Sequence, residues 1–71
     1  MLNRLRYYKA IRKLEVRLAE VQGRIDYYKA DLIINGDDND IAICSAVKLA
    51  EYLNEKALLL SNLKYIKSKL R

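Results

Sequence analysis

A single apolar seam through the first half of the chain constrains the fold more than any other feature. Its side chains recur at alternating intervals of three and four residues, a spacing that places them along one face of an α-helix. The seam consists of Tyr7, Ile11, Leu14, Leu18, Val21, Ile25, Tyr28 and Leu32, and no proline interrupts it. The spacing therefore predicts one helix over residues 2–34, which at about 1.5 Å rise per residue is on the order of 50 Å long.

Residues 35–40 break this pattern and predict a short loop. Asn35 and Gly36 suit a left-handed helix C-cap. The acidic residues that follow supply an N-cap, and their negative charge suits the positive end of a second helix, which is expected over residues 40–70. Because two long helices joined by so few residues fold back on each other, we expect an all-α protein in which residues 1–71 form one antiparallel helical hairpin.

The second helix is expected to face the first through a stripe that changes character along its length. Near the loop the stripe is rich in alanine, which allows a neighbouring helix to approach closely, and leucines fill a wider gap toward the chain ends. The first part of the stripe consists of Ala42, Ala46, Leu49, Ala50, Leu53, Ala57 and Leu60. The stripe then rotates around the helix and continues through Leu59, Leu63, Ile66 and Leu70.

A second apolar strip lies on the first helix, roughly opposite the main seam. Glycine within a helix costs about 1 kcal/mol relative to alanine. The heptad spacing of Gly23 with Val16 and Ala30 therefore indicates a close helix crossing, with a tolerated flaw or slight kink as the alternative. We interpret this strip as an oligomer or partner interface. It comprises Leu5, Val16, Gly23, Tyr27, Ala30 and Ile34.

The small size of the chain supports that interpretation. A 71-residue core rarely contributes more than about 3–5 kcal/mol without disulfides, a metal or oligomerisation. With one cysteine and no histidine, the chain can form neither an intrachain disulfide nor a zinc site of the usual Cys/His kind. We therefore expect a homodimer of two hairpins that forms a four-helix bundle, with a bundle completed by another protein as the alternative.

The charge distribution carries the main functional signal. The chain has a formal net charge of +5, and its basic residues concentrate at both chain ends while acids occupy the loop. Basic side chains also follow one strip of the first helix, interrupted by Glu20 and flanked by tyrosines, so they could track a phosphate backbone. The candidate polyanion-binding residues are Arg4, Arg6, Lys9, Lys13, Arg17, Arg24, Lys64, Lys67 and Lys69.

Assembly offers another explanation for the same charges. If two hairpins associate head to tail, the acidic loop of one approaches the basic end of the other. If they associate in the same sense, the basic ends gather and favour an acidic partner such as DNA or RNA. The sequence leaves both orientations open.

Several kinds of chemistry are excluded by the residues present. The chain has no histidine, no recognised pairing of nucleophile and base, and no glycine-rich phosphate loop, so we expect a non-enzymatic protein without cofactor, metal or small-molecule substrate. The loop does not fit a calcium-binding EF-hand, because Ile33 and Ala42 would occupy positions that need oxygen ligands. Cys44 is interpreted as a small packing residue, with a disulfide to a neighbouring protomer or a redox role as the alternatives.

These features lead to two functional hypotheses. The first is a self-associating hairpin that acts through protein–protein contacts as a regulator, inhibitor or adaptor. The second is a nucleic-acid-binding regulator that uses the basic strip and the basic chain ends. Charges interrupt every apolar run at the N-terminus, so we expect neither a signal peptide nor membrane association, and a cytoplasmic location suits the lone thiol.

Overall fold

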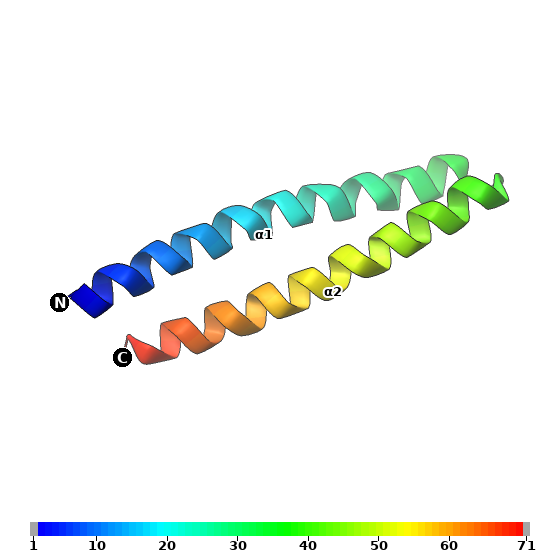
Figure 1. The fold of residues 1–71 in the computed structure, drawn as a ribbon. Helices are drawn as coiled ribbons and strands as arrows, with labels where there is room; N and C mark the ends of the chain where they lie inside the picture. The colour runs from blue at the N-terminus through cyan, green and yellow to red at the C-terminus, as the bar shows by residue number, and fades with distance from the viewer. Residues whose placement is uncertain (1, 71) are drawn as a thin grey trace.

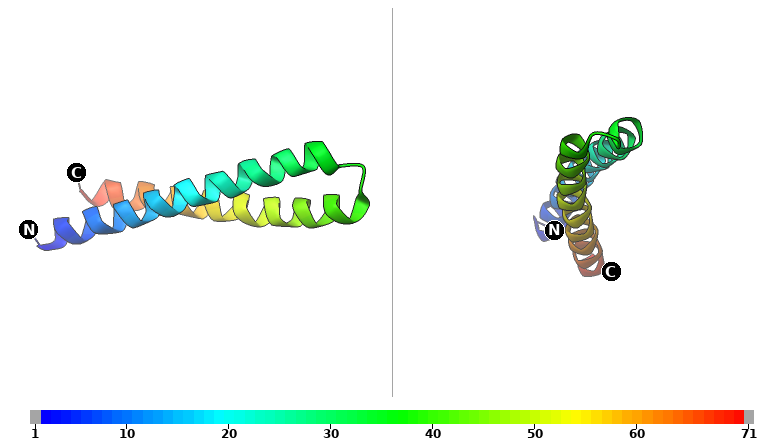
Figure 2. Two further views of the ribbon diagram at one scale, coloured as in Figure 1. Left: turned by 90° about the horizontal axis from the view of Figure 1, so that it is seen from above. Right: turned by 90° about the vertical axis from the view of Figure 1, so that its right-hand side faces the viewer.

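The computed structural model describes residues 2–70 and shows two antiparallel helices, α1 (Leu2–Asn35) and α2 (Asn39–Lys69). Figure 1 shows both chain ends at one end of the molecule and the connecting loop at the other. The Cα atoms extend 55 × 14 × 13 Å, and the two helix axes are inclined to each other (Figure 2). The expected all-helical hairpin is confirmed.

The core lies between α1 and the facing side of α2. Val21 and Ile25 are fully buried and pack with Leu59 at its centre. Every residue of the main seam on α1 is buried or half-buried, so the alternating spacing correctly identified the face that contacts α2. The apolar side chains that are buried nevertheless number five among the described residues, namely Ile11, Val21, Ile25, Leu59 and Leu63.

The contact face of α2 agrees with the expected stripe in part. The predicted residues that are buried or half-buried are Ala42, Leu49, Leu59, Leu63, Ile66 and Leu70. Ala46, Ala50 and Leu53 were predicted to face α1, but they are exposed, as are Ala57 and Leu60. The face that packs on α1 is a neighbouring row with its own alternating spacing of three and four residues. This row is Ala42, Ser45, Leu49, Tyr52, Lys56, Leu59, Leu63, Ile66 and Leu70, all of them buried or half-buried.

Three members of the row, Ser45, Tyr52 and Lys56, were not predicted because they are polar or amphipathic. Near the loop, Ser45 is buried and its hydroxyl donates a hydrogen bond to the Asp31 carboxylate. The same carboxylate accepts a 2.7 Å hydrogen bond from Asn35 Nδ2. A buried hydroxyl with a hydrogen-bond partner avoids most of the cost of leaving water. Ser45 can therefore occupy a position that an apolar pattern reserves for alanine or leucine.

The middle of the row is polar for a similar reason. Lys56 Nζ donates a 2.7 Å hydrogen bond to Gln22 Oε1 on α1, and the half-burial of Lys56 is tolerated because most of its side chain is aliphatic. The Tyr52 ring stacks on Tyr28, with ring centroids 5.9 Å apart and planes inclined by 16°. Each side chain contributes packing area and directs its polar group to a partner or toward solvent.

The loop contains the expected N-cap but lacks the expected C-cap. Asp38 caps α2, because its Oδ1 accepts hydrogen bonds from the backbone N–H groups of Asp40 (3.0 Å) and Ile41 (3.2 Å). No described residue has a positive φ, so the left-handed C-cap prediction is wrong. Gly36 is required on steric grounds instead, since a Cβ there would lie 2.5 Å from the Leu32 carbonyl oxygen.

The location of the core predicts that replacing two isoleucines of α1 by alanine has very different effects on stability. Ile25 is 1% exposed, and its replacement by alanine leaves a cavity, so Ile25→Ala should lower the free energy of unfolding by about 2–5 kcal/mol. Ile33 is 85% exposed, and Ile33→Ala should change it by less than about 0.5 kcal/mol. Urea denaturation followed by circular dichroism measures both values. Equal losses would contradict the placement of the core.

Candidate interaction surfaces

The predicted interface on the first helix lies on the solvent-facing side of α1, away from α2. We call it the α1 outer strip; it comprises Leu5, Val16, Gly23, Tyr27, Ala30 and Ile34. All six residues are exposed, and the four large side chains are each more than half exposed. Lys9, Arg12 and Lys13 occupy the same outer side of α1 between the first two members. The part of the α1 outer strip that is not interrupted by these basic residues therefore begins at Val16.

Gly23 has no packing role within the hairpin. A Cβ built on it would have no atom within 4 Å, so nothing in α2 requires a glycine there. The ring of Tyr27 lies beside it, edge-on to the ring of Tyr28 with centroids 5.1 Å apart, and Tyr28 in turn stacks on Tyr52 of α2. The core therefore positions the ring of this otherwise exposed tyrosine through Tyr28.

A second uncovered apolar surface lies on α2. It consists of Ile43 together with five residues that the sequence pattern assigned to the core. We call it the α2 outer strip: Ile43, Ala46, Ala50, Leu53, Ala57 and Leu60. Ile43 is 63% exposed, Leu53 43% and Leu60 47%, and the three alanines are exposed as well. The sequence contains one feature that could have predicted the exposure of this strip. The neighbouring row through Ser45, Tyr52 and Lys56 has the same alternating spacing and could have been recognised as the contact face.

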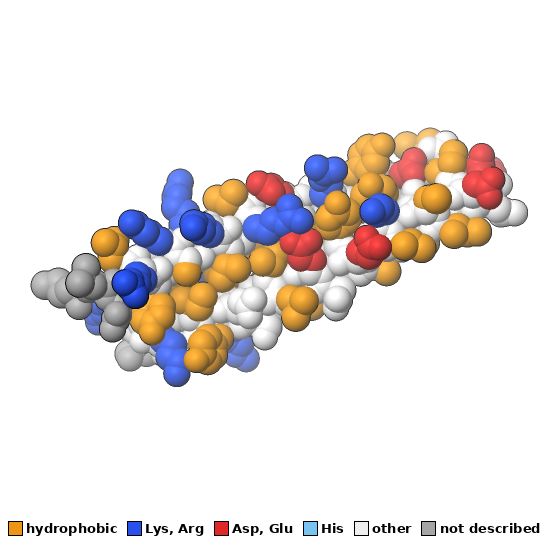
Figure 3. Space-filling view, viewed as in Figure 1, with side chains coloured by type: hydrophobic (Ala, Val, Ile, Leu, Met, Phe, Trp, Pro, Cys, Tyr) orange, Lys and Arg blue, Asp and Glu red, His pale blue; other side chains and the backbone are white. Residues whose placement is uncertain are grey.

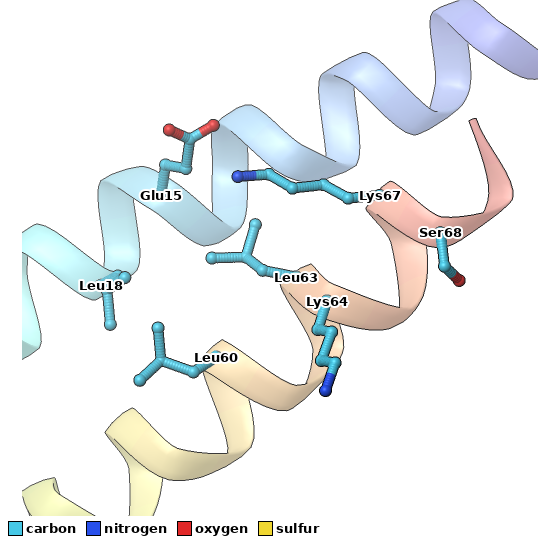
Figure 4. Close-up of a pocket in the computed structure, with 7 residues that line it drawn as sticks. All are labelled: Glu15, Leu18, Leu60, Leu63, Lys64, Lys67 and Ser68. Atoms are coloured by element: carbon cyan, nitrogen blue, oxygen red, sulfur yellow. The ribbon is translucent and has the colours of Figure 1, made fainter. Parts of the chain in front are cut away.

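The α2 outer strip ends in a hollow between the helices near the chain ends. Figure 4 shows Leu18, Leu60 and Leu63 pointing into this hollow, whose volume is about 540 Å³. Lys67 extends toward α1 at its rim, and Lys64 points away from α1. The hollow therefore has an apolar floor, and its edge carries two lysines from α2 and Glu15 from α1.

Arg17 is engaged in ion pairs with acidic neighbours. Its Nε and Nη2 donate hydrogen bonds of 2.6 and 3.0 Å to the two carboxylate oxygens of Glu55 on α2, and Nη1 donates a 3.1 Å bond to Glu20. These contacts raise the pKa of Arg17, the bond to Glu55 contributing most, and lower the pKa of Glu55. Arg17 and the two acids thus divide the predicted basic strip, separating Arg24 from the basic residues nearer the N-terminus.

The remaining candidates for polyanion binding lie in two exposed groups. Arg4, Arg6, Lys9 and Lys13 on α1, like Arg24, form no ion pair within residues 2–70. At the C-terminal end of α2, Lys69 Nζ lies 5.0 Å from the centroid of the Tyr65 ring. The hairpin brings the two chain ends together, so basic side chains gather there while acids lie along the middle and near the loop (Figure 3). Arg71 lies outside the described residues.

The described part of the chain offers little for other chemistry. Residues 2–70 contain no cluster of three or more His, Cys, Asp or Glu side chains suited to a metal ion. Neither described helix has a stretch apolar enough to cross a bilayer. Cys44 is exposed, so its interpretation as a packing residue is wrong for the hairpin alone: the thiol lies outside the row that contacts α1.

Comparisons with protein-family models, with curated proteins and with solved structures gave no significant match to this chain.

The Ser45–Asp31 contact predicts a pH-dependent effect on stability. The hydrogen bonds from Ser45 and then Asn35 hold the pKa of Asp31 below its ordinary value of 3.8, although partial burial opposes them. A carboxyl whose pKa is lowered by folding stabilises the folded state above its unfolded pKa, and this contribution is lost as the pH falls through the folded pKa. Ser45→Ala should therefore lower the free energy of unfolding at neutral pH.

The deficit caused by Ser45→Ala should shrink as the pH falls below the ordinary aspartate pKa of 3.8 and through the lowered pKa of Asp31. Ser61→Ala is the matched control, because Ser61 is exposed and donates no side-chain hydrogen bond among the described residues. Denaturation curves at several pH values measure the effect. A deficit that stays constant down to the acid limit would contradict the proposed stabilisation of the charged carboxylate.

Proposed function

We propose that this chain is a small non-enzymatic interaction protein that self-associates through apolar surface left uncovered by the hairpin. The observation that carries the proposal is the imbalance between buried and exposed side chains. Thirteen large hydrophobic residues are exposed among those described, whereas five apolar side chains are buried. Extended apolar surface of this kind marks an interface more often than a solvated face.

The shape of the hairpin explains why so much apolar surface is left. Two helices in contact can each bury one face, and these helices carry apolar residues on further faces. Ordering a chain costs about 1–2 kcal/mol per residue in backbone entropy, which a core of five buried side chains offsets poorly. Association of two hairpins into a four-helix bundle would bury additional faces and add the missing stability.

Within this proposal the protein acts by contact with other proteins, as a regulator, inhibitor or adaptor. The absence of histidine from the sequence and the lack of a recognised catalytic constellation favour binding over catalysis. A reducing, cytoplasmic location would suit an exposed, unpaired thiol such as Cys44.

Solution mass tests self-association directly. Light scattering on the eluting protein should give twice the mass of one chain at high concentration, and dilution over about a hundredfold should move the mass toward that of one chain if the dimer is of moderate affinity. Circular dichroism on the same samples shows whether helix content falls as the dimer dissociates. A fully helical monomer at every concentration would overturn the proposal.

A second candidate function is the binding of nucleic acid or another polyanion. The specific observation in its favour is that Arg6, Lys9 and Lys13 are exposed on one helix and lack ion-pair partners among the described residues. Ionic contacts with phosphates release counterions, so binding of this kind weakens steeply as salt rises. The ion pairs of Arg17 with Glu20 and Glu55 shorten the basic strip but do not involve these three residues.

A paired substitution separates specific phosphate contacts from net charge. Lys9→Gln with Lys13→Gln should weaken the binding of single-stranded RNA or DNA and reduce the slope of log affinity against log salt by about 1.4, because each contact with a single strand contributes about 0.7. Lys29→Gln with Lys48→Gln removes the same charge elsewhere and should have a smaller effect. Fluorescence anisotropy over a salt series measures both, and no binding at low salt by the unaltered protein would exclude this function.

A further inference from the structure

We infer that the α2 outer strip is the homodimer interface. A second copy docks on it head to tail, meaning antiparallel about a twofold axis, with Ile43 of each copy entering the hollow of the other. The inference rests on the proposed self-association and specifies the face and the orientation that it uses. Three independent features of the molecule support it: the spacing of the strip, the position of the hollow, and the charges beyond each end.

The α2 outer strip is complementary to a reversed copy of itself. Reading it in either direction gives the same intervals of three, four, three, four and three residues. A twofold axis between Ala50 and Leu53 therefore brings these two residues opposite each other across the interface. It also brings Ala46 opposite Ala57, where two small side chains permit a close helix approach over a contact about 25 Å long.

The same pairing places a large side chain beside the hollow. Ile43, at the loop end of the strip, comes opposite Leu60 of the second copy, and Leu60 lines the hollow together with Leu18 and Leu63. Ile43 is 63% exposed in the single hairpin, so its side chain is available to fill an apolar space. Symmetry repeats this contact at the other end of the strip.

Charges beyond the strip complement each other only in the head-to-tail orientation. Lys64 and Lys67 follow Leu60 at the rim of the hollow, and Asp37 and Asp40 precede Ile43 at the loop. Antiparallel docking sets the acidic loop of each copy against the two lysines of the other. Docking in the same sense would superpose the basic ends of both copies, which costs energy through like-charge repulsion.

The α1 outer strip is less suited to this role. Lys9, Arg12 and Lys13 lie between Leu5 and Val16, so the apolar surface on α1 is interrupted by charge. The α2 outer strip contains only apolar residues over its whole length. Its exposed alanines and leucines follow one another at intervals of three or four residues without a gap, a regular spacing that suits a symmetric partner.

Two sets of variants test which face is used. Leu53→Glu places charges next to the twofold axis and should weaken dimerisation at least tenfold, whereas Val16→Glu with Tyr27→Glu should leave the dimer intact. Both sites are exposed in the single hairpin, so helix content should be retained, as circular dichroism can verify. If the α1 variant dissociates and Leu53→Glu does not, the α2 interface is wrong while self-association stands; a monomeric unaltered protein would overturn self-association itself.

Disulfide cross-linking tests the orientation. In a Cys44→Ser background, Ala46→Cys with Ala57→Cys should give covalent dimers under mild oxidation, because these positions face each other across the axis. Ala46→Cys alone should cross-link poorly, since its two copies lie about 16 Å apart along the helices in the antiparallel pair. Efficient cross-linking by the single variant, or none by the double variant while the dimer persists, would contradict head-to-tail docking.

Discussion

The packing of the α1 seam against one face of α2 is the interaction on which the rest of the molecule depends. Val21, Ile25 and Leu59 form its centre, and they are among the few apolar side chains that the hairpin buries. A helix pair has a single contact plane, so any apolar residue outside that plane stays at the surface. Two apolar strips remain there as a direct result, one on each helix, and they dominate the functional interpretation.

The sequence was sufficient for the fold and for the contact face of α1, because an uninterrupted apolar seam leaves little choice of face. The contact face of α2 could not be read in the same way, since this helix carries two neighbouring rows with helical spacing. Hydrophobicity favours the row with Ala46 and Leu53. The structure uses the row with Ser45 and Lys56, because each of these polar groups finds a partner on α1.

The candidate basic site was also only partly predictable, and the reason is again tertiary. Helical spacing placed Arg17 near Lys13 and Glu20, but its bidentate pairing with Glu55 depends on how α1 and α2 align.

The two helices differ in the charges at their ends. Helix α2 has Asp40 in its first turn and lysines in its last turn, whereas α1 has no acid in its first turn. Arg4 and Arg6 thus lie at the positive end of their own helix dipole, where positive charge is unfavourable.

The hydrogen bond between Lys56 and Gln22 has a consequence for how the two helices choose their alignment. Leucine-rich faces tolerate sliding by a heptad, because one leucine can replace another in the same gap. Such a slide would bring Leu49 or Leu63 to Gln22 and would move Ser45 away from Asp31, leaving polar groups unpaired against apolar neighbours. The polar members of the contact row therefore disfavour shifted alignments that the leucines alone would accept.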